Sequence, residues 1–129
     1  MQPRSSRVLI VDDDRDTADT MVLVLESAGY HAFAVYSGRR ALEIVATFAP
    51  EIAIVDVEMP DMDGHATARA LREWAAGRPL ILIAHSGTIG LGGWYDTERF
   101  AHFDHLLAKP VNSKRLLRAL RAAPGRAHH

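Results

Sequence analysis

Residues 8–14, VLIVDDD, place four apolar side chains directly before three acids. The same design recurs in IAIVD (52–56), LILIAHS (80–86) and LLAKP (106–110), where an apolar run meets an acid, a hydroxyl or an ammonium group. Short apolar runs of this kind are typical of strands buried on both faces of a parallel sheet. Because the carboxyl ends of parallel strands lie along one edge, these polar residues are expected to meet in one site.

Segments with helical periodicity alternate with the apolar runs. After residue 14, apolar side chains recur at the i, i+3, i+4 and i+7 positions of an amphipathic helix, with Asp14 as its N-cap and Gly29 at its end. A last helix is predicted from the N-cap Asn112 to Pro124 and Gly125. The expected strands cover residues 7–11, 30–35, 51–55, 80–84 and 106–108.

The strict alternation of strands and helices predicts an α/β fold of the flavodoxin-like, doubly wound type. A five-stranded parallel sheet in the order 2-1-3-4-5 is expected, with five helices covering its two faces. The strand order reverses between the first and third strands, where such sheets bind ligands. Asp12, Asp13 and Asp56 end those two strands, so the sequence predicts an acidic site at this position.

The segment between the fourth and fifth strands is expected to hold a short or irregular fourth helix. Four glycines between residues 87 and 93 disfavour a regular helix, because glycine costs about 1 kcal/mol per helical position relative to alanine. Asp96 is a suitable N-cap. The helix is therefore expected to start late, after a loop that carries Trp94 and Tyr95.

The composition is that of one soluble globular domain. The chain has 129 residues, 48% of them hydrophobic and 24% charged, which suits a single domain with its own core. The net charge of -1 gives no electrostatic reason to expect binding to nucleic acid or to a membrane. The chain has no cysteine, no apolar run near the roughly 20 residues of a membrane span and no signal-peptide core, so a cytoplasmic protein is expected.

The residues at the strand ends suit phosphoryl transfer. Carboxylates bind a hard cation such as Mg²⁺, one carboxylate can act as a nucleophile, and an ammonium group stabilises negative charge on the transferring oxygens. Carboxylates that lie together favour protonation, and a cation together with Lys109 would keep Asp56 ionised. Ser86 supplies a neutral donor whose position depends on whether phosphate is present, as expected of a switch element.

The four segments, in their order and spacing, resemble the receiver domain of bacterial two-component response regulators. The resemblance rests on VLIVDDD, IVDVEMPDMDG, IAHSG and LLAKPV, and it covers residues 7–122. It implies that residues 1–129 are a single receiver domain with no effector domain in this chain. It also implies a signalling switch with slow autodephosphorylation, not a turnover enzyme.

The resemblance also assigns roles to individual residues. Asp56 is the implied phosphoacceptor, which takes a phosphoryl group from a phosphohistidine. Asp13 and Asp56 are implied to bind Mg²⁺ directly, Asp12 through water or as a further ligand, and the backbone carbonyl of Glu58 completes the protein ligands. Lys109 is implied to pair with Asp56 at rest and with the phosphoryl oxygens afterwards.

Further expectations concern the switch and its partners. Ser86 is implied to hydrogen-bond the phosphoryl group and to pull its loop inward, and Pro110 to follow a cis peptide bond. The implied partner is a sensor histidine kinase or a phosphotransfer protein, with a homodimer or an effector domain on the face of the fourth and fifth helices. No contact with a membrane and no direct binding of nucleic acid is expected. Leu106 replaces the aromatic residue usual in receivers, and the effect of the acid Glu58 near the phosphoryl group is left open.

Two other readings of the sequence compete with a phosphorylated switch. The first is a flavodoxin-like ligand-binding or phosphatase domain, but the acids of residues 12–14 would repel a flavin phosphate, and a phosphatase would leave Asp56 and Lys109 unexplained. The second is a degenerate receiver that acts as a phosphorylation-independent interaction module. The presence of Asp13, Asp56 and Lys109 argues against it.

Overall fold

A five-stranded parallel sheet forms the centre of the molecule in the computed structural model, which describes residues 6–59, 64–87 and 100–127. The strands lie in the order β2-β1-β3-β4-β5, and each neighbouring pair is parallel. This confirms the predicted fold and strand order. The strands are β1 (Arg7–Val11), β2 (His31–Val35), β3 (Ile52–Asp56), β4 (Ile81–Ser86) and β5 (His105–Ala108).

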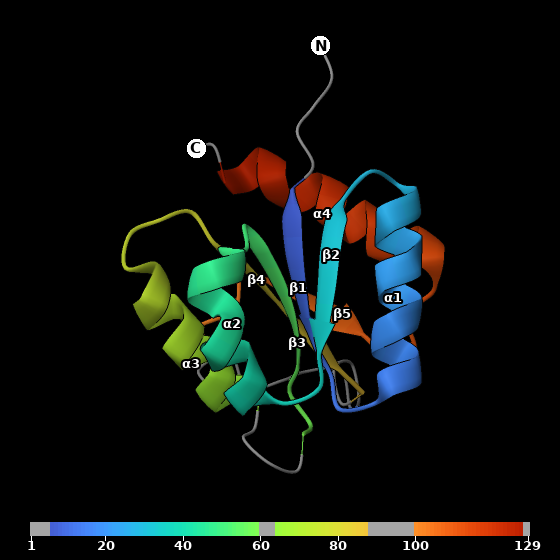
Figure 1. The fold of residues 1–129 in the computed structure, drawn as a ribbon. Coiled ribbons are helices and arrows are strands. Elements are labelled where there is room, and N and C mark those ends of the chain that lie inside the picture. The colour runs from blue at the N-terminus through green and yellow to red at the C-terminus, as the bar shows by residue number, and fades with distance from the viewer. Residues whose placement is uncertain (1–5, 60–63, 88–99, 128–129) are drawn as a thin grey trace.

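Helices cover both faces of the sheet (Figure 1). The helices in the described ranges are α1 (Arg15–Ser27), α2 (Gly38–Phe48), α3 (Gly64–Ala75) and α4 (Ser113–Ala127). Side chains alternate along β1, so that Val8 and Ile10 pack with α1 and α4, while Leu9 and Val11 pack with α2 and α3. The unbroken apolar character of the strands follows from this burial on both faces.

The helix ends agree with the predicted caps. The side chain of Asp14 accepts a hydrogen bond from the backbone N–H of Thr17, and that of Asn112 accepts one from the N–H of Arg115. Gly29 follows α1 with a φ of 97°, a conformation that favours glycine. The two caps start their helices just beyond the carboxyl ends of β1 and β5.

Several boundaries differ from the predicted ones: β2, β3, β4 and β5 each start one residue away from the predicted position, and three ends differ as well. The strands β3 and β4 extend to Asp56 and Ser86, because both residues continue the parallel ladder, with Asp56 opposite His85 and Ser86 opposite Ala108. The end predicted for the last helix at Pro124 was wrong, since α4 continues to Ala127. A proline removes one helical hydrogen bond without ending the helix here.

The predicted fourth helix, with its loop and its aromatic residues Trp94 and Tyr95, lies outside the described residues. Four helices rather than five are therefore seen in the described part of the chain. None of these helices is long and apolar enough to cross a membrane.

Candidate functional site

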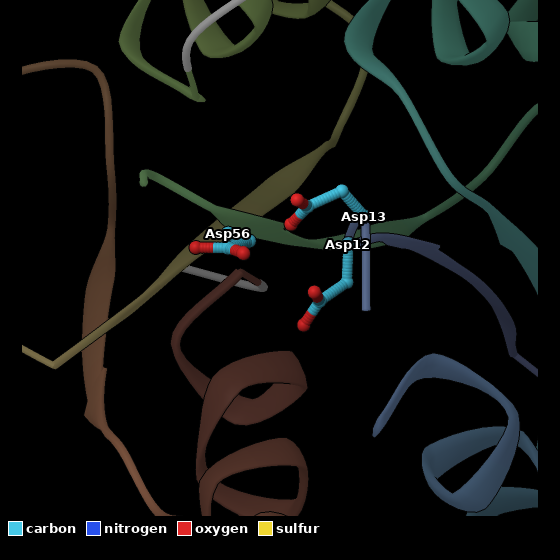
Figure 2. A group of neighbouring side chains, drawn as sticks. All are labelled: Asp12, Asp13 and Asp56. Carbon is cyan, nitrogen blue, oxygen red and sulfur yellow. The ribbon is translucent and has the colours of Figure 1, made fainter. Parts of the chain in front are cut away.

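Three carboxylates meet at the carboxyl ends of β1 and β3, where the strand order reverses (Figure 2). One oxygen from each of Asp12, Asp13 and Asp56 lies within 4.8 Å of the others. Asp12 and Asp56 are each 2% exposed, whereas Asp13 is exposed to solvent. The two adjacent acids after β1 and the single acid at the end of β3 thus come together as the sequence predicted.

Backbone donors hold the two buried carboxylates in place. Asp12 Oδ1 accepts a hydrogen bond of 2.9 Å from the N–H of Asp14, and Asp56 Oδ1 accepts one of 2.9 Å from the N–H of Glu58. The N–H of Asp12 itself donates to the carbonyl of Val35 at 3.1 Å. Both acids are therefore fixed by the turn that directly follows their own strand.

Lys109 is the only lysine among the described residues whose ammonium group lies beside these acids. Its Nζ is 3.0 Å from Asp56 Oδ1 and 3.5 Å from Glu58 Oε1. Its backbone N–H donates to the carbonyl of Ser86 at 3.0 Å, which fixes the end of β5 against β4. The peptide bond between Lys109 and Pro110 is cis, as expected.

The electrostatics of the cluster set the charge of each group. Burial raises the pKa of Asp56, and the nearby Asp12 adds to this effect, against the lowering by the N–H of Glu58 and by Lys109. Burial alone would raise the pKa of Asp12 as well, but His85, the N–H of Asp14 and Lys109 together lower it. Burial opposes the charge on Lys109, yet its carboxylate neighbours raise its pKa. The pKa of Asp56 is thus raised while those of Asp12 and Glu58 are lowered, so an added positive charge would stabilise the ionised form of Asp56 most.

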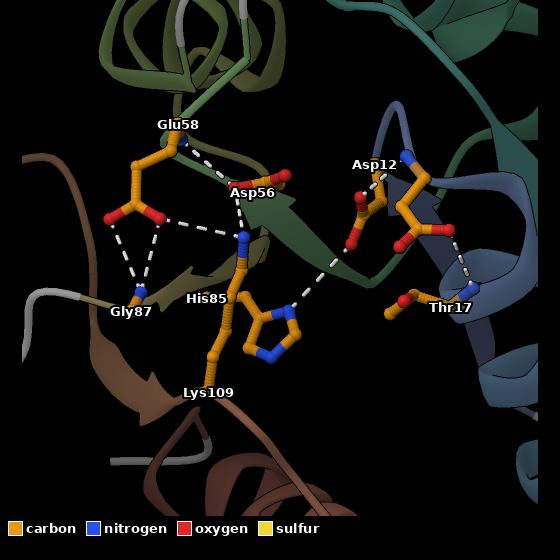
Figure 3. Close-up of polar contacts among 8 residues, drawn as sticks. Asp12, Thr17, Asp56, Glu58, His85, Gly87 and Lys109 are labelled. Atoms are coloured by element: carbon orange, nitrogen blue, oxygen red, sulfur yellow. Dashed lines mark hydrogen bonds and ion pairs between the residues drawn. The ribbon is translucent and has the colours of Figure 1, made fainter.

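The Ser86 hydroxyl faces Glu58. Ser86 is fully buried, and its Oγ donates to Glu58 Oε2 at 2.5 Å. The N–H of Gly87 donates to both carboxylate oxygens of Glu58, at 3.1 and 3.2 Å (Figure 3). Burial would raise the pKa of Glu58, but Ser86, Gly87 and Lys109 lower it to about 2. The sequence assigned the backbone carbonyl of Glu58 to the cation and left the effect of its acidic side chain open; it is this side chain that forms these contacts.

His85 is a site residue to which the sequence assigned no role. It is 2% exposed, and its Nδ1 lies 3.8 Å from Asp12 Oδ2 (Figure 3). That distance is too long for a hydrogen bond, and the two groups form an ion pair when the imidazole is protonated. His85 lies on β4 directly opposite Asp56 of β3, and this register places its ring beside the acids.

The acids have the chemistry of a hard-cation site. Their ligand atoms are all carboxylate oxygens, which Mg²⁺ prefers, and one of the acids is exposed, which leaves room for bound water. They line a cleft of about 370 Å³ together with Glu58, His85 and Lys109. The residues present therefore fit a Mg²⁺ ion beside Asp56.

Gly64 allows the backbone to close around Asp56. A Cβ atom at this position would lie 2.9 Å from the carbonyl carbon of Asp56 and closer still to its oxygen and to Cα of Val57. Real side chains do not approach a backbone that closely. The glycine of the MPDMDG segment is therefore required by the packing of α3 on the end of β3.

Comparison with known proteins identifies the family of this site. The family model of the response regulator receiver domain matches residues 8–121. The response regulator MprA of Mycolicibacterium vanbaalenii is 31% identical over 120 residues, which cover 90% of this chain and 49% of that protein. The MprA protein of Mycobacterium ulcerans is also 31% identical, and the match covers 50% of its length. The chain thus spans about half the length of the curated relatives it matches.

Solved structures agree with this family. A CheY-like response regulator receiver domain from Methylobacillus flagellatus has a TM-score of 0.80 and 29% identity, with 92% of this chain and 98% of that chain covered. A sensor protein from Polaromonas sp. JS666 has a TM-score of 0.82 and 32% identity, with 97% and 99% covered. From its sequence motifs, its sheet order, its acidic cleft and these matches, the chain belongs to the receiver domain family of response regulators.

Proposed function

We propose that this receiver domain is a phosphorylatable signalling switch in which Asp56 accepts a phosphoryl group in a Mg²⁺-dependent reaction. The observation that carries the proposal is the position of the Asp56 carboxylate, which is 2% exposed, lies 3.0 Å from the Lys109 ammonium and has two further acids beside it. Cationic partners stabilise the ionised form of a buried carboxylate whose pKa is raised, and Lys109 together with a bound cation would supply that charge to Asp56 and to the phosphoryl oxygens.

The reaction transfers one phosphoryl group without redox chemistry. A carboxylate oxygen of Asp56 attacks the phosphorus of a phosphohistidine, the new P–O bond forms as the P–N bond breaks, and the electron pair of that bond stays on the imidazole nitrogen. Lys109 stabilises the charge on the phosphoryl oxygens. Asp12, Asp13, Asp56 and the backbone carbonyl of Glu58 would hold Mg²⁺, which when bound supplies positive charge to the transferring group.

The donor of the phosphoryl group is proposed to be a sensor histidine kinase or a phosphotransfer protein. The proposal for the response is that Ser86 changes its hydrogen bond once Asp56 is phosphorylated, because its hydroxyl lies at the end of the strand next to β3. The altered surface would act on a second copy of the chain or on an effector domain. We also propose that residues 1–129 act as a single receiver domain in the cytoplasm.

The competing functions have less support. A flavin carrier would need a loop after β1 that attracts phosphate, and residues 12–14 are all acids. A receiver that is never phosphorylated does not require a lysine beside a buried aspartate, yet Lys109 lies in that position next to Asp56. No observation favours either of these functions over phosphorylation of Asp56.

A labelling experiment tests the proposal. The purified chain is incubated with Mg²⁺ and acetyl phosphate, and incorporation is followed by intact-protein mass spectrometry, with Asp56→Asn as the variant and Asp19→Asn, at an exposed acid on α1, as the control. Wild type and control should each gain one phosphoryl group that is stable in acid and labile to base and hydroxylamine. Labelling of Asp56→Asn at the wild-type rate would refute the assignment.

A further inference from the structure

The carboxylate of Glu58 is bound by three groups beside Asp56 that could each bind an anion. Its carboxylate accepts from the Ser86 hydroxyl and from the Gly87 N–H, and it lies 3.5 Å from the Lys109 ammonium. These three donors come from the ends of two different strands, β4 and β5, and they converge on one carboxylate. Each of these donors stabilises the charged form of the carboxylate.

A phosphoryl group on Asp56 would need the same three donors. Lys109 is shared already, since its Nζ is 3.0 Å from Asp56 Oδ1 and 3.5 Å from Glu58 Oε1. The backbone N–H of Glu58 donates to Asp56 at 2.9 Å, so the two side chains leave the same turn, and the Lys109 ammonium lies between their carboxylates (Figure 3). The other two donors, the hydroxyl of Ser86 and the amide of Gly87, are bound to the Glu58 carboxylate.

The charge balance makes joint occupancy unfavourable. A divalent cation bound by Asp12, Asp13 and Asp56 would offset only two of their three negative charges, and the Glu58 carboxylate, which is not part of that cluster, adds one more. Among the described residues, Lys109 is the cationic side chain that lies near both the Glu58 carboxylate and the incoming phosphoryl oxygens. Two anions that share one ammonium group repel each other across a short distance.

We infer that the Glu58 carboxylate is an internal competitor, which occupies the phosphoryl-binding donors in the unphosphorylated state and leaves them when Asp56 is phosphorylated. The inference rests on the proposed function. The side chain of Glu58 is 37% exposed, so it can turn into solvent without losing much buried surface. The competition lowers the affinity of the site for a phosphoryl group and stabilises the unphosphorylated state. Glu58 thereby sets the threshold of the switch.

Equilibrium binding of beryllofluoride in the presence of Mg²⁺ tests the inference without any enzymatic turnover. Beryllofluoride bonds to the carboxylate of Asp56 and presents fluorine atoms where phosphoryl oxygens would lie. Its binding is followed by fluorine NMR and by the chemical shift of the Gly87 amide. The variants are Glu58→Gln, which keeps the shape of the side chain, and Glu58→Ala. Glu43→Gln, whose acid pairs with Arg40 on the exposed face of α2, is the matched control.

Removal of the competing charge should lower the half-saturating beryllofluoride concentration by about tenfold or more, because the donors no longer have to be released from a charged partner. The control should bind as wild type does. Equal affinity of wild type and Glu58→Gln, or weaker binding by the variant, would overturn the competitor role and leave the phosphoacceptor assignment intact. Absence of binding in every variant would overturn both.

A double-mutant cycle gives a second test. If Ser86 is bound to Glu58 in the free protein, then Ser86→Ala removes a hydrogen bond from both the free and the beryllofluoride-bound wild type. In a Glu58→Ala background the Ser86 hydroxyl gains a charged partner only when beryllofluoride binds. Ser86→Ala should therefore weaken beryllofluoride binding by a clearly larger factor in that background than in wild type. Equal factors in the two backgrounds would contradict the competition.

Discussion

Replacement of Gly64 by alanine tests how closely the backbone approaches at the phosphoacceptor. The added Cβ would lie 2.9 Å from the carbonyl carbon of Asp56 and nearer still to its oxygen and to Cα of Val57. All three are backbone atoms and cannot rotate away, so α3 and the end of β3 must separate. Overpacking of this kind costs roughly 1–3 kcal/mol. Alanine is the better helix former by about 1 kcal/mol in a helix interior, but Gly64 is the first residue of α3, where this gain is smaller.

The expected result is a loss of about 2 kcal/mol in the free energy of unfolding. For a domain of this size that loss lowers the melting temperature by about 6 to 10 °C. Thermal and urea unfolding give the stability, and labelling with acetyl phosphate gives the effect on Asp56, which should become slower. Gly77→Ala is the control, because Gly77 has a φ of 95° and nothing within 4 Å of its added Cβ, so it should cost only about 1 kcal/mol of backbone strain and leave labelling unchanged. A Gly64→Ala protein that unfolds and labels as wild type does would refute the reasoning.

Three further predictions concern the charged groups. Asp13→Ala should weaken Mg²⁺ binding, so that added Mg²⁺ raises the melting temperature of wild type but much less that of the variant; equal shifts would remove Asp13 from the cation site. Ser86→Ala and Lys109→Ala should both remain folded, as judged by circular dichroism, and should each change the response of amide shifts to beryllofluoride; wild-type responses in both would end their roles in the switch. Glu58 has its pKa lowered from 4.5 to about 2 in the folded protein, so its charge stabilises the fold above pH 4.5, and the stability advantage of wild type over Glu58→Gln should disappear as the pH falls toward 2. An advantage that does not change over that range in urea unfolding would contradict this linkage.

The sequence predicts the sheet and its acidic edge because both depend on strong local patterns. Apolar runs that are buried on both faces have a distinct composition, and strict alternation with helices leaves few topologies. The acids at the end of β1 and β3 must then lie together, since parallel strands end at one edge. The family resemblance adds the roles of Lys109 and Ser86, which residue type alone does not specify.

The contacts of Glu58 and His85 are not predictable in the same way. The direction of the Glu58 side chain depends on where Ser86 and Gly87 lie, and these residues are brought close only by the pairing of β3 with β4. An acid two residues after Asp56 is a signal that some charge effect exists, but it does not give the sign. His85 precedes a serine at the end of a buried strand, and only the register opposite Asp56 places its ring near Asp12.

The central claim is that Asp56 carries the phosphoryl group, and borohydride trapping tests it most directly. The protein is phosphorylated with acetyl phosphate and Mg²⁺, reduced with borohydride, digested and sequenced by mass spectrometry, because reduction converts an aspartyl phosphate to homoserine. The account predicts homoserine at position 56 and at no other aspartate. Homoserine at Asp12 or Asp13, or none in a protein that has gained a phosphoryl group, would contradict it.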